Sequence, residues 1–255
     1  MAELTPQQAN EQIFLRLQQL EVAAHDATDN ALGVERTPEA LAGAMRRVTK
    51  LEDKEIDAIQ KRIDERAARG EIANIDCKKG CWFCCTQMVA VTIPEVLRLA
   101  DHIRATWSPE QRAELDQRMS NYMGDTAPWH AGDRSKKARP VCPLLNRGEG
   151  ICSVWPERPL VCRSLNSTDH KACITKRDDP VNDPPIPQIM GQFYTAMYSR
   201  NGLRNALKKH GLENELYEMI PALITAMADP DASEKYFAGE PIFESTRIPT
   251  EDLGT

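Results

Sequence analysis

The stretch CKKGCWFCC, Cys77–Cys85, constrains this chain more than any other, because it places four cysteines within nine residues. Turn-forming residues stand beside several of the chain's cysteines, such as Gly80 before Cys81 and Pro143 after Cys142. Turns allow several thiolates to converge on one point, which a regular helix or strand does not. We therefore predict a metal site, whose candidate ligands are all eight cysteines of the chain: Cys77, Cys81, Cys84, Cys85, Cys142, Cys152, Cys162 and Cys173.

The rest of the sequence indicates the compartment of the protein and argues against some classes of partner. No apolar run approaches the ~20 residues of a membrane helix, and the start MAELTPQQANEQ has no secretory signal. We therefore expect a cytoplasmic protein without membrane contact, whose cysteines are thiols or metal ligands instead of disulfides. The net charge of −6 argues against a nucleic-acid partner, and the basic run RSKKAR at 134–139 is expected to be a solvated loop.

The spacing of the cysteines bears on which metal they bind. Zinc sites usually combine two C-x2-C pairs, and only Cys81 and Cys84 form such a pair here. Iron–sulfur clusters often take ligands from runs such as C-x2-C and C-x3-C plus a distant cysteine. The run C-x3-C-x2-C-C thus favours an iron–sulfur cluster, with zinc as the open alternative. Because Cys84 and Cys85 are neighbours, we expect them to serve two sites, or one to ligate while the other packs.

The candidate ligands differ in how well their surroundings are patterned. Cys85 is a weaker candidate than the six that lie in turn-rich motifs, and Cys173 is the weakest because its segment HKACITKRDD is less patterned. The six strongest candidates are Cys77, Cys81, Cys84, Cys142, Cys152 and Cys162. Cations beside the ligands would offset the negative charge of a thiolate site, and aromatic rings would keep water away from it. The candidates for these two roles are the cations Lys78, Lys79, Arg158 and Arg163 and the rings Trp82, Phe83 and Trp155.

Apolar residues at helical spacing predict a mainly α fold, in which a helical scaffold surrounds an irregular, metal-stabilised cysteine-cluster domain with little β structure. We expect helices at residues 5–28, 37–69 and 187–228, and two more after the capping residues Thr92 and Ser108. A short β-like run precedes Thr92. Residues from 124 to 186 lack periodicity, and the tail from residue 229 is expected to be a loop.

Three regions follow from this organisation. They are an N-terminal helical region at 1–70, the cysteine-cluster metal-binding domain at 71–175, and a C-terminal helical region with its tail at 176–255. The N-terminal helices contain no cysteine. We expect them to pack on the rest of the chain or to pair with a protein partner or a second subunit.

One enzyme motif is matched but does not fit its context. Cys77, Cys81 and Cys84, with Phe83 in the aromatic slot, match the C-x3-C-x-aromatic-C signature of radical S-adenosylmethionine enzymes. That signature normally follows the first strand of a βα barrel, and the sequence has no βα alternation. We therefore do not assign the chain to that class.

Taken together, the motifs are more specific than any of them alone, and the chain resembles the YkgJ-type cysteine-cluster family. The resemblance covers residues 75–165 and rests on these elements: the run Cys77–Cys85, then Val91-Thr92-Ile93-Pro94-Glu95, then Cys142-Pro143-Leu144-Leu145, and Gly150–Trp155 with Arg158-Pro159 and Cys162-Arg163. Trp155 stands where such sequences usually have Tyr. The resemblance implies a zinc- or iron-chelating domain.

Three hypotheses for the function follow. The first is a cytoplasmic protein whose cysteine thiolates hold an iron–sulfur cluster, or iron or zinc, in a structural or redox role. The second is an iron–sulfur enzyme using S-adenosylmethionine, because the resembled family includes flagellin lysine N-methylases, although this chain lacks much of their additional length. The third is a zinc-stapled interaction module. Catalytic residues are not assigned, since none of the histidines forms an H-E-x-x-H motif.

Overall fold

The computed structural model describes residues 6–126, 140–179 and 184–249. It confirms a mainly α fold with little β structure. The helices are α1 (Pro6–Val34), α2 (Pro38–Ala68), α3 (Ile93–Thr106), α4 (Pro109–Thr126), α5 (Leu160–Ser164), α6 (His170–Asp178), α7 (Met190–Lys209), α8 (Met219–Ala228) and α9 (Ala232–Ala238). The strands are β1 (Ala90–Val91), β2 (Leu145–Asn146), β3 (Ile151–Cys152) and β4 (Tyr217–Glu218), and the 3-10 turns are η1 (Phe83–Thr86), η3 (Trp155–Glu157) and η4 (Glu244–Thr246). The basic run at 134–139 lies outside the described residues.

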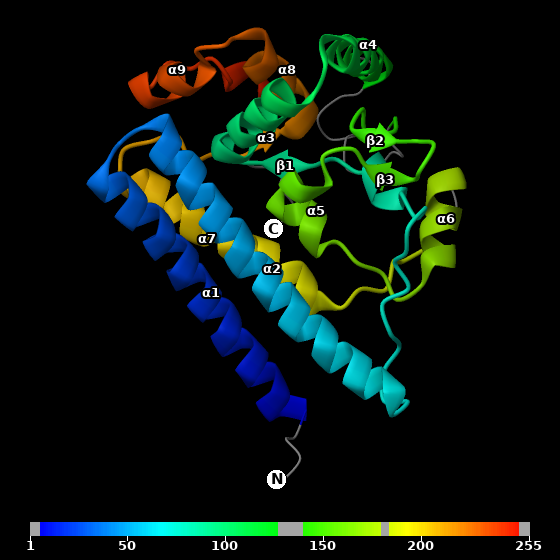
Figure 1. Cartoon of the computed structure of the whole chain (residues 1–255). Coiled ribbons are helices and arrows are strands. Elements are labelled where there is room, and N and C mark those ends of the chain that lie inside the picture. Colours follow the sequence, from blue (N-terminus) through cyan, green and yellow to red (C-terminus); the bar gives the residue numbers. More distant parts are fainter. Residues whose placement is uncertain (1–5, 127–139, 180–183, 250–255) are drawn as a thin grey trace.

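Three long helices, α1, α2 and α7, pack side by side along one flank of the molecule (Figure 1). Gly202 on α7 permits this packing, because a Cβ there would lie 2.1 Å from the carbonyl oxygen of Glu21 on α1. The start of α2 is as predicted, with Thr37 Oγ1 accepting a hydrogen bond from the Ala40 amide at 3.2 Å. Helix α1 continues to Val34, beyond the predicted end at residue 28.

The main core lies where α3 packs against α8, with α4 and α9 beside them (Figure 1). The β-like run before Thr92 forms β1, which pairs antiparallel with β4 in the register Ala90 to Glu218. The predicted capping box at the start of α3 is present, since Glu95 Oε2 accepts from the Thr92 amide at 2.8 Å. Helix α8 continues the apolar face, with Leu223 fully buried.

Two sequence predictions were wrong. The region 124–186 was predicted to be irregular, but its described part holds β2, β3, α5 and α6. The tail from residue 229 was predicted to be a loop, but it forms α9. These helices are only five to nine residues long, too short for apolar periodicity to be recognised.

The division into three regions at residues 70 and 175 stays a prediction, as does pairing of the N-terminal helices with another subunit. Within the chain, α7 from the third region packs on α1 and α2 from the first. A search of the described residues finds no helix whose length and apolar character would let it cross a membrane.

Candidate metal centre

The loop that carries the first four cysteines is folded by two turns. Gly80 has a φ of 89°, which other residues rarely adopt, and the amide of Cys81 donates to the carbonyl of Lys78 at 2.9 Å. The 3-10 turn η1 follows, and the Cys85 amide donates to the Trp82 carbonyl at 3.0 Å. These turns place Cys84 and Cys85 side by side.

A second segment approaches this loop through two glycines. The Gly80 amide donates to the Gly150 carbonyl at 3.3 Å, and a Cβ on Gly150 would lie 2.6 Å from the Cα of Gly80. Only glycine at position 150 permits this contact. It fixes the 77–85 loop against the hairpin formed by β2 and β3.

The hairpin brings Cys142 and Cys152 to Cys85. The Cys142 amide donates to the Cys85 carbonyl at 2.7 Å, and Cys152 on β3 pairs with Leu145 on β2. The amide of Leu145 in turn donates to the Cys142 carbonyl at 3.0 Å. The backbone itself therefore holds these cysteines in one neighbourhood.

Cys162 is positioned by α5, which the helical scaffold anchors. The Leu160 amide at the start of α5 donates to Glu95 Oε1 at 2.9 Å. Arg163 pairs with both carboxylate oxygens of Asp53 on α2 at 3.0 Å. Burial raises the pKa of Cys162 well above its usual value, and the neighbouring thiols add to the effect.

Cys173, whose segment is less patterned in sequence, lies on α6, where it is 4% exposed. Asp169 caps α6 by accepting from the amides of Lys171 at 2.8 Å and Ala172 at 3.2 Å. The His170 ring pairs with Asp76, next to Cys77. Helix α6 packs against η1, so Cys173 faces the first cysteine loop.

Interactions among the thiols show which cysteines are neighbours. Burial raises the pKa of Cys77 to about 11, and Cys81, Cys84 and Cys173 raise it further by charge repulsion. Burial raises the pKa of Cys142 to about 12, and charge repulsion from Cys152 and Cys84 raises it as well.

Cys84 is the exception among these thiols. A hydrogen bond from the Cys85 thiol lowers the pKa of Cys84 to about 7, and the same bond raises the pKa of Cys85. The Arg158 guanidinium also favours the Cys84 thiolate. Cys84, which is exposed, is therefore the thiol most readily ionised near neutral pH.

Two arginine–tryptophan pairs flank the cysteines. The guanidinium of Arg158 lies over the Trp155 ring at 3.4 Å from its centroid, and that of Arg177 lies over Trp82 at 4.4 Å. The sequence analysis named Arg158 but missed Arg177, whose distance along the chain from Trp82 leaves no local signal.

The other predicted cations have carboxylate partners. Lys78 lies 3.6 Å from Asp76, and Lys79 lies 3.7 Å from Glu149. Both lysines are largely exposed, and such pairs contribute little to stability.

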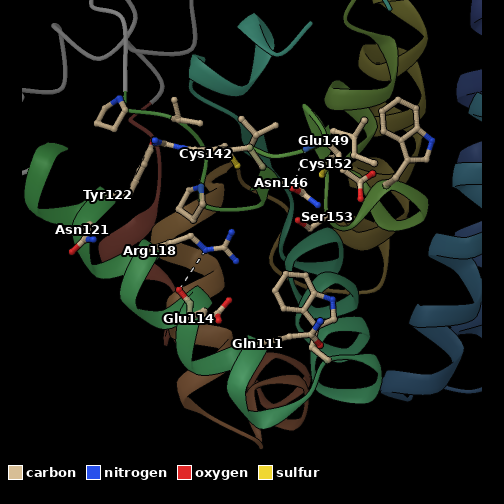
Figure 2. A pocket seen from close by; sticks show the side chains of 18 of the residues that line it. Gln111, Glu114, Arg118, Asn121, Tyr122, Cys142, Asn146, Glu149, Cys152 and Ser153 are labelled. Carbon is tan, nitrogen blue, oxygen red and sulfur yellow. Dashed lines mark hydrogen bonds between the residues drawn. The ribbon is translucent and has the colours of Figure 1, made fainter. Parts of the chain in front are cut away.

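A cleft of about 930 Å³ opens beside Cys142 and Cys152. Figure 2 shows α4 along one wall and the hairpin segment along the other. The labelled residues of the α4 wall are Gln111, Glu114, Arg118, Asn121 and Tyr122, and those of the facing wall are Cys142, Asn146, Glu149, Cys152 and Ser153. A small molecule in the cleft would reach two of the candidate ligands.

The chemistry of the donors fits a thiophilic metal, because all eight cysteines are free and thiolates select zinc, copper(I) and iron–sulfur clusters. As the side chains stand, however, no three Cys, His, Asp or Glu residues of the described chain lie close enough to hold one metal ion.

Fold and site together define a mainly helical protein with a cysteine-cluster domain built against its scaffold. Residues 76–180 match the family model CxxCxxCC, described as "Putative zinc- or iron-chelating domain". The match covers less than half of the chain and agrees with the cysteine-cluster family that the sequence motifs resemble. The match extends past Cys162 and includes Cys173. Comparisons with curated proteins and with solved structures find no match to this chain.

Proposed function

We propose that this chain is a cytoplasmic protein that holds an iron–sulfur cluster through its cysteine thiolates, in a structural or redox role. The observation that carries the proposal is that segments up to 96 residues apart in the chain carry eight free cysteines and pack around η1 and the β2–β3 hairpin. The match to the family model of a zinc- or iron-chelating domain covers this region.

Iron–sulfur chemistry is favoured over zinc by the donor set. The candidate donors are sulfur, with only one C-x2-C pair, whereas structural zinc sites commonly use two such pairs. Hydrogen bonds, nearby charge and solvent exposure tune the potential of an iron–sulfur cluster. The cation Arg158 and the half-buried setting of most of the cysteines would supply such tuning.

A structural role is supported by the local architecture. The segment from 140 to 179 is built from two-residue strands and helices of at most nine residues, too short to be stable alone. Metal–thiolate bonds would tie these elements together. Because the thiols do not yet converge at ligand distance, metal binding and local folding would be coupled.

The test is anaerobic purification followed by an absorption spectrum and by iron, sulfide and zinc analysis. We expect a brown protein with broad absorption near ~400 nm, the colour of sulfide- and thiolate-to-iron charge transfer. The matched control is the same protein after chelation and again after reloading with iron and sulfide. A colourless, folded protein with stoichiometric zinc would overturn the iron–sulfur assignment and favour the zinc-stapled interaction module.

A second candidate function is an iron–sulfur enzyme that uses S-adenosylmethionine, similar to the flagellin lysine N-methylases. The cleft beside Cys142 and Cys152 favours it, because a ligand there would lie next to a cluster held by these residues. Adding S-adenosylmethionine to the reduced protein should then change its electron paramagnetic resonance signal. An unchanged signal at saturating S-adenosylmethionine would exclude this function, and S-adenosylhomocysteine serves as a control for binding without chemistry.

A further inference from the structure

We propose that the cleft between α4 and the β2–β3 hairpin binds a small organic anion, a molecule with one planar ring system and one phosphate or carboxylate group. Arg118 binds the anionic group, and Trp155 stacks on the ring. The inference goes beyond the proposed metal binding and does not depend on it, because neither residue is a candidate metal ligand. It defines the ligand only by the groups that the cleft can recognise.

The cleft has the size of a ligand site and walls that are held from behind. Its volume of about 930 Å³ falls in the range of about 300–1,000 Å³ that is typical of small-molecule sites. On one side, α4 packs on α8. On the other, the Gly150 carbonyl of the hairpin accepts from the Gly80 amide at 3.3 Å. The cleft is therefore formed without a ligand, as most small-molecule sites are.

Arg118 points from α4 into the cleft and has unused donors (Figure 2). Its Nε donates to the carbonyl oxygen of Glu114, one helical turn earlier, at 3.4 Å. Within the described part of the chain, neither Nη atom has a carboxylate or carbonyl partner. A guanidinium presents its N–H groups as a planar fork that matches carboxylate and phosphate oxygens. Arg118 is therefore placed to bind two oxygens of an anionic group.

The facing wall adds donors for the same group. Arg147 lies in the turn between β2 and β3, lines the cleft and is exposed. The Oδ1 atom of Asn146 accepts from the amides of Gly148 at 3.0 Å and Glu149 at 3.2 Å. This orients the side chain of Asn146 and leaves its amide N–H groups available as donors. Both walls thus favour an anion between them.

Carboxylates in the cleft limit the charge of the ligand. Glu114 and Asp125 of α4 line the cleft and are exposed. Glu149 lines it too, but its charge is offset by Lys79 at 3.7 Å. A polyphosphate would be repelled by the carboxylates of α4, whereas a single anionic group at Arg118 would not. The N–H or O–H groups of a ligand could donate to the same carboxylates.

Trp155 supplies a surface on which a ring can stack. It lines the cleft and is 54% exposed, a large apolar area to leave in water. The Arg158 guanidinium covers one face of the indole, 3.4 Å from the ring centroid. The exposed part therefore comprises the opposite face and the edges, where an aromatic ligand would gain stacking energy. Trp107, at the end of α3, adds a second, half-buried indole to the lining.

The test is isothermal titration calorimetry of the full-length, anaerobically purified protein with four probes. AMP carries a ring and a phosphate, and indole-3-acetate carries a ring and a carboxylate. Adenosine lacks the anionic group, and inorganic phosphate lacks the ring. At least one ring-bearing anion should bind about tenfold or more tightly than adenosine and inorganic phosphate, because hydrogen bonds to charged groups are strong. Tighter binding of AMP identifies a phosphate ligand, and tighter binding of indole-3-acetate a carboxylate.

Variants assign the binding to the two residues. Arg118→Gln should weaken the binding of the ring-bearing anions by about tenfold or more. Trp155→Ala should weaken it similarly by removing the stacking surface, but should leave the affinity for inorganic phosphate unchanged. Arg112→Gln is the matched control, because it removes the same charge from α4 at a residue that does not line the cleft. Its affinity should equal that of the wild type.

Three results would overturn the inference: no binding of AMP or indole-3-acetate, equal binding of the ring-bearing anions and adenosine, or equal losses in Arg112→Gln and Arg118→Gln. Metal analysis of the same samples keeps the inference separate from the proposed function, since Arg118→Gln should retain its metal. If Arg118→Gln does not fold, Arg147→Gln decides, because Arg147 is exposed on a turn. That variant should bind about twofold to fivefold more weakly, and an unchanged affinity would count against the site.

Discussion

The carboxyl group of Glu95 links the helical scaffold to the cysteine cluster, and its removal is the most informative perturbation. Glu95 Oε2 accepts from the Thr92 amide at 2.8 Å and from its hydroxyl at 2.9 Å, and Oε1 accepts from the Leu160 amide at 2.9 Å. Thr92 and Leu160 are 0% and 1% exposed. One side chain therefore holds the first turns of both α3 and α5.

The expected effect of Glu95→Ala follows from the two backbone amides it leaves without a partner. An unsatisfied buried donor costs about 1–3 kcal/mol, so the two together should lower the free energy of unfolding by about 2–6 kcal/mol. The total stability of a domain is about 5–15 kcal/mol, so a substantial part of it would be lost. Since α5 carries Cys162, the affinity of the protein for metal should fall as well.

The assay is urea unfolding followed by circular dichroism, combined with Co²⁺ titration of each variant. Glu110→Ala is the matched control, because Glu110 also lies in the first turn of a helix but its carboxylate is exposed and accepts from the exposed Ser108 hydroxyl at 2.8 Å. That change should stay within about 0.5 kcal/mol, as is typical of surface positions. If Glu95→Ala were no more destabilising than Glu110→Ala, or if it left the metal affinity unchanged, Glu95 would not link α3 to the cluster.

Three further predictions concern a buried acid, the helix packing and the cysteines. Burial, together with repulsion from Glu95, raises the pKa of Glu52 well above its usual value, so the folded state binds the extra proton. The free energy of unfolding should therefore fall as pH rises from about 4.5 towards the pKa of Glu52 in the folded state, by at most about 1.4 kcal/mol per pH unit. Glu52→Gln should abolish this pH dependence, which urea unfolding measured across that range would show. Gly202→Ala places a Cβ 2.1 Å from the backbone of α1 and should lower the melting temperature, with a loss of at least about 1–3 kcal/mol; an unchanged melting temperature would contradict the close α1–α7 contact. Cys81→Ser should lose metal and become sensitive to protease within residues 140–179. Cys173→Ser should lose as much metal, because Cys173 is buried on α6, which packs on η1. Metal analysis of both variants tests whether these two cysteines bind the same metal.

The sequence predicted best those features that depend on neighbouring residues. Both ends of helix α2 were predicted, because the residues that start it, with Thr37 as the cap, and those that end it stand at the ends of the helix. The box formed by Thr92 and Glu95 was also predicted. The bond from Leu160 to Glu95 was not, because it joins residues 65 positions apart and no local pattern encodes it.

In the candidate site, too, the sequence predicted the local features and missed the contacts between distant residues. The cysteine motifs gave the candidate ligands and the resemblance to the family whose model matches residues 76–180, but not how the segments that carry the cysteines pack together. Cys173 ranked last because its segment HKACITKRDD is less patterned, whereas its place on α6 and the packing of α6 on η1 are features of the fold. The stacking of Arg177 on Trp82 likewise arises from that packing. Such contacts follow from the fold as a whole, so they became visible only when α6 was placed.

The anchoring of the cysteine segments also indicates how the protein responds to losing its metal. Cys162 is tied to the scaffold without metal, because Glu95 holds the start of α5 and Arg163 of α5 pairs with Asp53 on α2. The 77–85 loop instead depends on contacts through Ser167 and on the short helix α6. Without metal, the scaffold and the position of α5 should therefore persist, while α6 and the 77–85 loop lose order first, because fewer buried contacts hold them.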